Sequence, residues 1–539
     1  MFPHALPGAK VSIDRRVARS AAVWLLIALG TGFVAEIARL GEVTHDAFHE
    51  MALVREALVS GSFPFTDRFA YTETVSPSVH HEWGTGAILY FATVSTGLGL
   101  HGLTVLKFCL IGAMWSMLYR VARMRGVHPY LFAIFSITVF PMLWVGFATI
   151  RATMFTLLCI SIQLWMHELD RRGHRWWLAL WWCMLVVWLN LHAGFVVGVG
   201  LLALHSTERF AILLRQTGSW ASAWRSTGHL AWAAPLVVAA LPCNPYGWQY
   251  APYLINAISM PRPLISEWLP LWHTHDPIVT LILFTISIAL VLMACRDQPF
   301  ERLGGLLGLA ICALLALKHL RHGSIYSVVW IAYAPAWLSH TQFGRDLVAK
   351  IRKRPRLAVG CAQALVLVTV SWAMTHSAWK TTVSGDTQPL SYPTGAVKYL
   401  SRHSFAGNLL TPFHAGSFVS WELHPQVKVS LDGRYEVAYA PRVFDEHWDF
   451  FEGKSNWTQL LRAYPHDAIL VNQSAQVRPK LEAFRHASPT TPFDSIDQPQ
   501  WKFVYEDDSF VILAKSGSQL PYENHSSPES ANVRLTRAE

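Results

Sequence analysis

The chain has 539 residues, of which 52% are hydrophobic and only 15% are charged, with a formal net charge of +9. A soluble globular protein carries roughly 25% charged residues, so this composition excludes an ordinary soluble enzyme and indicates a chain that lies largely in lipid. The positive charge does not indicate nucleic-acid binding, because the basic residues occur in short clusters between apolar runs and not along one exposed stripe.

The first apolar run of membrane length covers residues 20–40 and follows a basic segment that contains Arg15, Arg16 and Arg19. Its length is that of a transmembrane helix, and it lacks the small-residue cleavage site of a secretory signal peptide. We therefore expect an uncleaved first transmembrane helix, preceded by a short cytoplasmic segment, residues 1–19.

The loop of residues 41–100 concentrates carboxylates and imidazoles beside the membrane, where a partner or a substrate has to offset their desolvation. Asp46 is the first candidate, as a general base that accepts the proton of an incoming hydroxyl. The alternative is a helix N-cap, a position that Asp favours. His81 and Glu82 are candidates for positioning an acceptor or sharing the acid–base chemistry, and their alternative role is an interfacial anchor around Trp83.

A metal site is a further hypothesis for this loop. His45 and His49 are four residues apart and share a face of the helix that the apolar spacing of residues 47–60 predicts, and Glu50 follows. Together they offer ligands for a divalent metal ion, although with 25 His in the chain this spacing also arises by chance. The same spacing predicts an amphipathic helix on the membrane surface, with a solvated connecting helix as the alternative.

Ten further apolar runs bring the expected number of transmembrane helices to about eleven. These runs cover residues 101–121, 129–147, 152–168, 176–191, 193–207, 228–243, 277–295, 302–318, 323–340 and 357–375. Every second loop between them is rich in Lys and Arg, which indicates the cytoplasmic side. The loop 41–100 and the segment after residue 375 then lie on the opposite, outer side.

Basic residues on the outer side break this charge rule and are candidates for binding a phosphate group. Lys318, Arg321 and His322 cluster between two spans, and Arg151 lies alone in another outer turn. Arg offers a planar fork of donors and Lys a point charge for a phosphate. The alternative is that these side chains reach ordinary phospholipid headgroups.

Three polar residues in outer loops, Asn190, His192 and Glu267, are candidates for contacting sugar hydroxyls. Roles in turns or at the membrane interface are the alternative for each. With the basic cluster and the first loop, they place every candidate on one side of the membrane, which indicates a single active site.

The composition changes after residue 375, where short apolar runs alternate with helical patterns. Strands are expected at 408–412, 427–431, 468–471 and, as a hairpin, at 503–506 and 510–514. Helical patterns lie at 393–401, 417–424, 457–463 and 477–486. This alternation predicts a small soluble α/β domain over residues 376–515, followed by a disordered tail, residues 516–539. Asp432-Gly433-Arg434 predicts a tight turn with a structural Asp–Arg pair.

Eight short motifs bear on the family. They are Thr44–His49, Phe63–Thr72, His81–Trp83, Trp188–Gly194, Asn244–Gly247, Glu267–Trp268, Arg321–His322 and Leu431–Arg434. As a set they resemble the GT-C superfamily of polytopic glycosyltransferases over residues 20–440. The resemblance implies a mainly α polytopic membrane protein of about eleven transmembrane helices, residues 20–375, with a C-terminal soluble α/β domain. Many members carry a paired Asp-x-Asp or Asp-Glu, where this chain has Phe48 and the partner acid would be Glu50 or Glu82.

The resemblance implies an inverting glycosyltransferase that moves a hexosyl or pentosyl unit from a polyprenyl-phosphate donor to a glycan, lipid or protein acceptor, with Asp46 as the general base. Lys318 and Arg321, with Arg151, would stabilise the departing phosphate, so that no general acid is required. The protein is then expected in the bacterial inner (plasma) membrane, in contact with membrane lipids, with its N-terminus cytoplasmic and its α/β domain periplasmic. The alternative is a non-catalytic flippase for lipid-linked glycans or a membrane assembly protein. Transporters place ionisable residues near the bilayer midplane, whereas the candidates here lie on one side.

Overall fold

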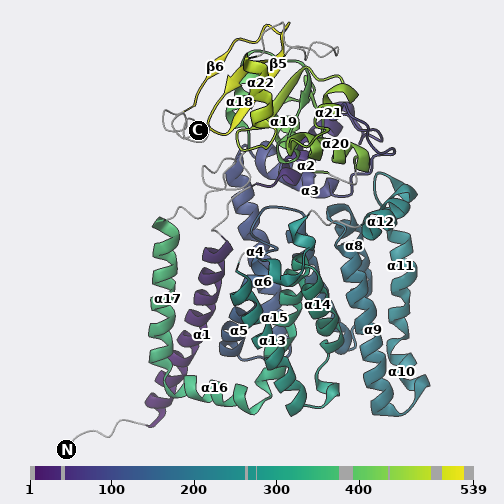
Figure 1. Ribbon diagram of the computed structural model, residues 1–539. Coiled ribbons are helices and arrows are strands. Elements are labelled where there is room, and N and C mark those ends of the chain that lie inside the picture. The colour runs from purple at the N-terminus through teal and green to yellow at the C-terminus, as the bar shows by residue number, and fades with distance from the viewer. Residues whose placement is uncertain are drawn as a thin grey trace, which may run out of the picture. The chain divides into compact units, whose positions relative to one another are not determined.

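The computed structural model describes residues 7–37, 43–260, 265–274, 276–375, 392–434, 438–486 and 501–526. It forms two compact units (Figure 1). The membrane unit comprises Met1–Gly41 and Gly97–Thr381, and the α/β unit comprises Glu42–Thr96 and Thr382–Glu539. The loop predicted to carry the catalytic motif therefore belongs with the C-terminal domain, and the α/β unit is built from two separate stretches of sequence.

The membrane unit is helical in every one of the eleven runs predicted to span the membrane. Among the described residues, five helices are long and apolar enough to cross a membrane: Arg19–Ile37 of α1 (Pro7–Ile37), α4 (Leu100–Met124), α9 (Phe195–Thr217), α13 (Pro277–Asp297) and α17 (Pro355–Thr375). The other runs form α5 (Pro129–Ser136), α6 (Phe140–Trp144), α7 (Thr153–Arg171), α8 (Trp177–Leu191), α11 (Ala233–Ala240), α14 (Leu306–Lys318) and α15 (Gly323–Ser339). The connecting helices are α10 (Trp220–Thr227), α12 (Tyr250–Ser259) and α16 (Gln342–Lys353).

Helix α15 forms the core of the membrane unit. Its residues are buried from Gly323 to Leu338, and it packs against α4, α5, α6, α7, α13 and α14. A helix that is apolar on all sides needs this kind of enclosure. The run 129–147 is broken between α5 and α6, where Pro141 lacks the N–H that a continuous helix needs.

The α/β unit contains a six-stranded sheet with the order β2-β1-β3-β5-β4-β6. The strands are β1 (Gly407–Leu410), β2 (Val427–Val429), β3 (Ala468–Asn472), β4 (Trp501–Glu506), β5 (Phe510–Lys515) and β6 (Glu523–Asn524). β1 pairs in parallel with β2 and β3, whereas β5 is antiparallel to both β3 and β4. β3 and β5 are buried along almost their whole length, as expected for strands covered on both faces.

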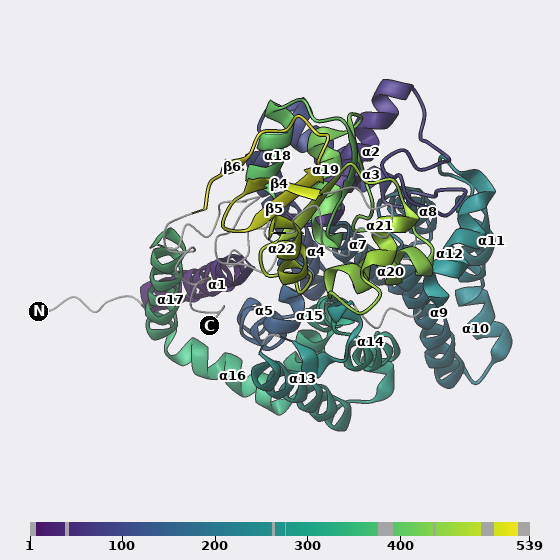
Figure 2. The same ribbon diagram turned by 45° about the horizontal axis from the view of Figure 1, so that its top comes forward.

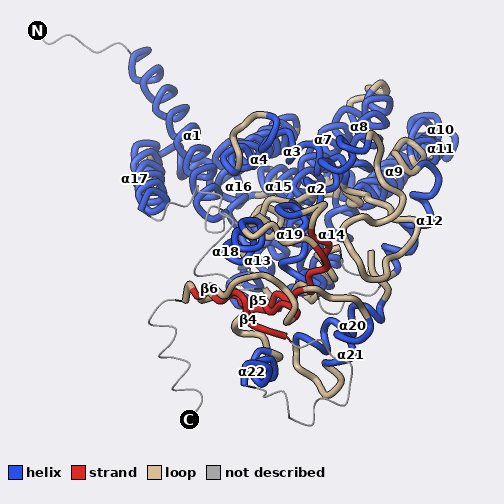
Figure 3. Tube along the Cα trace, turned by 90° about the horizontal axis from the view of Figure 1, so that it is seen from above, coloured by secondary structure: helices blue, strands red, loops and turns tan. Residues whose placement is uncertain are grey.

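Helices cover this sheet on both sides. They are α18 (Thr394–Arg402), α19 (Phe413–Leu423), α20 (Pro441–Phe451), α21 (Thr458–Ala463) and α22 (Arg478–His486). Figures 2 and 3 show α18 and α22 on opposite sides of β4 and β5. The predicted hairpin is present, and Asp507 closes its turn by accepting hydrogen bonds from the N–H groups of Ser509 and Phe510 at 2.8 and 2.7 Å.

Two sequence expectations need correction. Strand β6 pairs with β4 inside the segment expected to be disordered, so order extends to residue 526, and residues 527–539 lie outside the described residues. Helix α2 (His45–Ser60) is not an interfacial surface helix along its length, because it packs against α3 (Trp83–Tyr90) and α19 and is buried from Ala47 to Val54. The predicted fold class, a mainly α polytopic membrane protein with a C-terminal α/β domain, is confirmed.

Candidate functional site

Asp46 lies in the first turn of α2, two residues after Thr44, which occupies the N-cap position. The carboxylate is therefore not the cap, and the helix dipole favours its negative charge at this position. The Asp46 side chain is 39% exposed, and His45 Nε2 lies 3.4 Å from Asp46 Oδ1. An accessible carboxylate at a helix start is suited to receive a proton from a bound hydroxyl.

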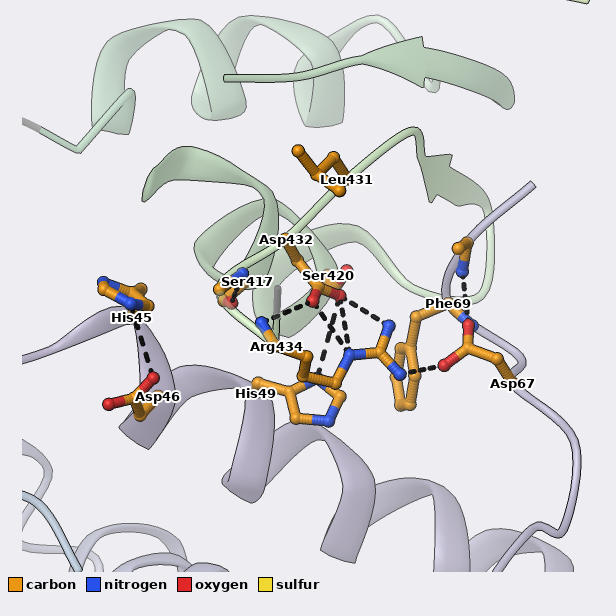
Figure 4. A network of polar contacts seen from close by, with 12 residues as sticks. His45, Asp46, His49, Asp67, Phe69, Ser417, Ser420, Leu431, Asp432 and Arg434 are labelled. Carbon is orange, nitrogen blue, oxygen red and sulfur yellow. Dashed lines mark hydrogen bonds and ion pairs between the residues drawn. The ribbon is translucent and has the colours of Figure 1, made fainter. Parts of the chain in front are cut away.

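Arg434 anchors a buried charge network behind α2 (Figure 4). Its guanidinium donates to Asp432 through Nε at 2.8 Å and through Nη2 at 2.6 Å, and its Nη1 forms an ion pair with Asp67. Asp67 also accepts the N–H groups of Phe69 and Ala70 at 2.9 and 2.7 Å. The network thus ties the two sequence stretches of the α/β unit together.

The charges in this network hold one another in the ionised form. Burial alone would raise the pKa of the Asp67 carboxyl, but Arg434 lowers it below its usual value. Burial alone would lower the pKa of Arg434, but Asp432 and Asp67 raise it well above the usual value. The turn predicted to contain a structural Asp–Arg pair does contain it, and the second carboxylate, Asp67, is the member that sequence reasoning missed.

The inner face of α2 carries two more ionisable groups. His49 Nδ1 lies 3.9 Å from Asp432 Oδ2, and its ring centroid lies 5.7 Å from that of His80. Burial, followed by Arg434, lowers the pKa of both imidazoles, that of His80 to about 3, so both are neutral at physiological pH. Burial, followed by Glu82 and Asp46, raises the pKa of Glu50 well above its usual value, which shows that these three carboxyl groups interact.

His81 and Glu82 stay close together at the start of α3, with His81 Nε2 lying 3.3 Å from Glu82 Oε1. Glu82 occupies the N-cap position of α3. Because α2 packs against α3, Glu82 and Asp46 both lie close enough to Glu50 to raise its pKa.

The residues proposed for a metal ion do not fit one. His45 is directed to Asp46 and to the Phe413 ring, whose centroid is 5.4 Å away, whereas His49 faces Asp432. Across the described ranges, no three His, Cys, Asp or Glu side chains are grouped so that they could hold a metal ion. No chemical step is therefore assigned to a metal.

A second polar cluster lies within the membrane unit, where the turn before α7 meets the 3₁₀ turns Ser266–Trp268 and Leu320–His322. Arg151 and Glu267 form a bidentate ion pair. The Arg321 guanidinium lies 4.8 Å from the centroid of the Trp268 ring, and His319 Nδ1 lies 2.6 Å from the Trp268 carbonyl oxygen. The structure thus joins residues that the sequence placed in three separate loops.

The charge of this second cluster is positive. His322 is part of it, since its ring centroid lies 6.4 Å from that of Trp268. Lys318 ends α14 and is exposed. Lys318 and Arg321 thus add two basic side chains to the Arg151–Glu267 pair.

Asn190 and His192 have structural roles in the turn between α8 and α9. Asn190 Nδ2 donates to the carbonyl oxygens of Val186 and Cys243, both at 2.8 Å. His192 is buried, with Nδ1 lying 2.7 Å from Thr156 Oγ1. Their polar groups thus hold the turn, and a contact with sugar hydroxyls stays a prediction for both residues.

Comparisons with known proteins bear on the fold. No protein-family model and no curated protein sequence matches the chain. The similar solved structures include the Archaeoglobus fulgidus oligosaccharyltransferase tethered with an acceptor peptide containing the NVT sequon, apo ArnT from Cupriavidus metallidurans, and the mycobacterial arabinofuranosyltransferase AftD.

For the oligosaccharyltransferase the TM-score is 0.52 at 11% identity, covering 83% of this chain and 69% of that one. For ArnT it is 0.53 at 13% identity, covering 91% and 97%. The chain has the GT-C fold. AftD gives a TM-score of 0.50 at 14% identity over 94% of this chain but only 40% of its own. The GT-C fold predicted from the short motifs is thus confirmed, whereas a shared fold does not by itself assign a residue's role.

Proposed function

We propose that this protein is a membrane glycosyltransferase that moves a sugar from a polyprenyl-phosphate donor to an acceptor hydroxyl, with inversion at the anomeric carbon. Asp46 takes the proton of the hydroxyl, whose oxygen forms a bond to the anomeric carbon. The bond between that carbon and the phosphate oxygen breaks, and its electron pair leaves with the phosphate. His81 and Glu82 position the acceptor, and the reaction takes place on the outer side of a bacterial inner membrane.

The observation that carries the proposal is the contrast in accessibility around Asp46. Its side chain is 39% exposed, while those of Asp67 and Asp432 are 1% and 0% exposed and are neutralised by Arg434. Glu82 is 17% exposed. Asp46 is thus the most exposed of these four carboxylates, and the buried network behind it holds α2 in place.

The cations of the membrane unit suit the leaving group. A departing phosphate carries negative charge that fixed cations stabilise without reorganisation. Arg321 is held in place by Trp268, and Lys318 adds a second positive charge at the end of α14. In the proposal these two residues bind the donor phosphate, while Arg151, paired with Glu267, holds the Trp268 turn.

The test offers purified protein in lipid nanodiscs a panel of polyprenyl-phosphate sugars, with and without a mixture of glycan and lipid acceptors. We expect release of polyprenyl phosphate with one donor class and an inverted anomeric configuration in the product. Arg321→Met should reduce turnover about 10²-fold, the usual effect of removing one stabiliser of the developing charge. Lys353→Met, an exposed cation on α16, is the matched control.

The outcomes separate the classes of protein. Loss of donor turnover in Asp46→Asn would support the proposed transferase function if turnover is kept in Asp508→Asn. Asp508 is an exposed carboxylate at the β4–β5 turn and serves as the control. Movement of intact lipid-linked glycan across a vesicle membrane, with no turnover of any donor, would instead establish a flippase.

A further inference from the structure

Aromatic rings follow one another from the neighbourhood of Asp46 to the surface of the α/β unit. The His45 ring lies 5.4 Å from Phe413, Phe413 lies 6.2 Å from Phe444, and Phe444 lies 6.2 Å from Trp448 at an interplanar angle of 23°. We name Phe413, Phe444 and Trp448 the aromatic track. It connects α19, which follows β1, with α20.

One part of the aromatic track packs against the core of the α/β unit, and another part is exposed to solvent. Phe413 and Phe444 are partly buried and pack against a buried cluster that includes Leu431, Tyr439 and Val443. Trp448 is 43% exposed. Rigid aromatic surfaces of this kind supply a large contact area at low cost in conformational entropy.

Trp448 has a carboxylate residue on either side of it along α20. On α20, Asp445 lies one turn before Trp448 and Asp449 follows it, and Asp449 accepts hydrogen bonds from Lys454 and Asn456 at 2.7 and 2.6 Å. Carboxylates repel anionic lipid headgroups, and an interfacial helix needs a continuous apolar face with basic residues beside it. An aromatic ring flanked by hydrogen-bond acceptors instead suits a sugar, which has apolar ring faces and hydroxyl donors at its edges.

We propose that the aromatic track binds successive sugar rings of a glycan acceptor, of which the ring nearest His45 presents its hydroxyl to Asp46. The acceptor is then a glycan of several sugar residues, in place of a single sugar, a peptide or a simple lipid. This inference rests on the proposed transferase function, because it uses Asp46 as the base. It adds the acceptor class, which the reaction chemistry alone leaves open.

The test measures binding of defined oligosaccharides to the full-length protein in nanodiscs by calorimetry. The probes are α- and β-linked glucose, mannose, arabinose and N-acetylglucosamine oligomers of one to four residues. We expect the affinity for at least one series to rise with length. Trp448→Ala should weaken binding of the longest oligomer about tenfold, and Trp448→Phe should keep most of it. Tyr522→Ala, at a second exposed aromatic of the α/β unit, is the control.

Two results would overturn the inference. One is equal glycan binding by wild-type protein and Trp448→Ala, or binding that does not depend on length. The other is cross-linking of a photoreactive amino acid at position 448 to bilayer lipid in place of glycan, which would make Trp448 a membrane anchor. Glycan binding without any transferase activity would contradict the proposed function, but it would still support the aromatic track as a glycan-binding site.

Discussion

Replacement of Arg434 by Met should destabilise the α/β unit more than any surface substitution. The side chains of Arg434, Asp67 and Asp432 are 9%, 1% and 0% exposed, so Arg434→Met leaves two buried carboxylates without their counter-charge. Breaking a buried ion pair from one side costs about 3–5 kcal/mol. For a unit of about 200 residues, each kcal/mol lowers Tm by about 2–4 °C. The expected loss is therefore about 6–20 °C.

The assay measures thermal unfolding of the full-length protein. At each temperature, the unfolded fraction of the α/β unit is determined from its cleavage by a protease. Arg442→Met is the control, since this Arg is 72% exposed and pairs with Glu446 on its own helix. Its Tm should not change measurably. The triple variant Asp67→Asn, Asp432→Asn, Arg434→Met should recover much of the loss, because neutral amides replace the unpaired charges. A Tm shift below about 3 °C in Arg434→Met would refute the reasoning that the network is desolvated.

Three further predictions concern the two clusters. Gly433→Ala should reduce the rate of sugar transfer about 10²-fold, because a Cβ atom at position 433 would lie 2.0 Å from the His45 ring beside Asp46. Gly517→Ala is the control, because a Cβ atom there would meet nothing within 4 Å. Equal transfer rates of the two variants would contradict this packing. The pKa of His80 is about 3 in the folded protein and about 6.5 in an unfolded chain. Between these pH values the unfolded state binds more protons than the folded state, so the stability of the α/β unit should decrease as the pH is lowered from about 6.5 towards 3. His80→Phe should show a smaller Tm loss between pH 7.5 and 5 than wild type, and an identical loss would show that His80 is not the sensitive group. Arg151→Glu and Glu267→Arg should each raise the KM for the donor, because either change releases the Trp268 turn. The double variant, which exchanges the two charges, should restore the wild-type KM. A KM that stays high in the double variant would mean that the Arg151 charge itself binds the donor.

The fold was accessible from the sequence because its signals are local. Apolar run length places the helices of the membrane unit, and the alternation of short apolar runs places β1 to β5. The break of residues 129–147 was not predicted, although Pro141 in the first turn of α6 is a local signal for it. Strand β6 was not predicted, because its two residues have no apolar pattern and form a strand only by pairing with β4.

The candidate site was only partly accessible, since its geometry depends on contacts between distant segments. Asp46, Glu50 and Glu82 could be grouped because they share one loop. The bond between Asp67 and Arg434 joins residues 367 positions apart, and no spacing rule predicts it. The helical spacing that suggested a metal pair was misleading, because His45 and His49 turn to different partners.

The most direct test of the central claim is the single-turnover rate of polyprenyl phosphate release by wild-type protein, Asp46→Asn and Asp508→Asn, with the productive donor and acceptor at saturation. The account predicts a rate about 10²–10⁴-fold lower for Asp46→Asn, the usual contribution of a general base, with wild-type rates for Asp508→Asn. Release by Asp46→Asn at the wild-type rate would contradict the assignment of Asp46 as the base.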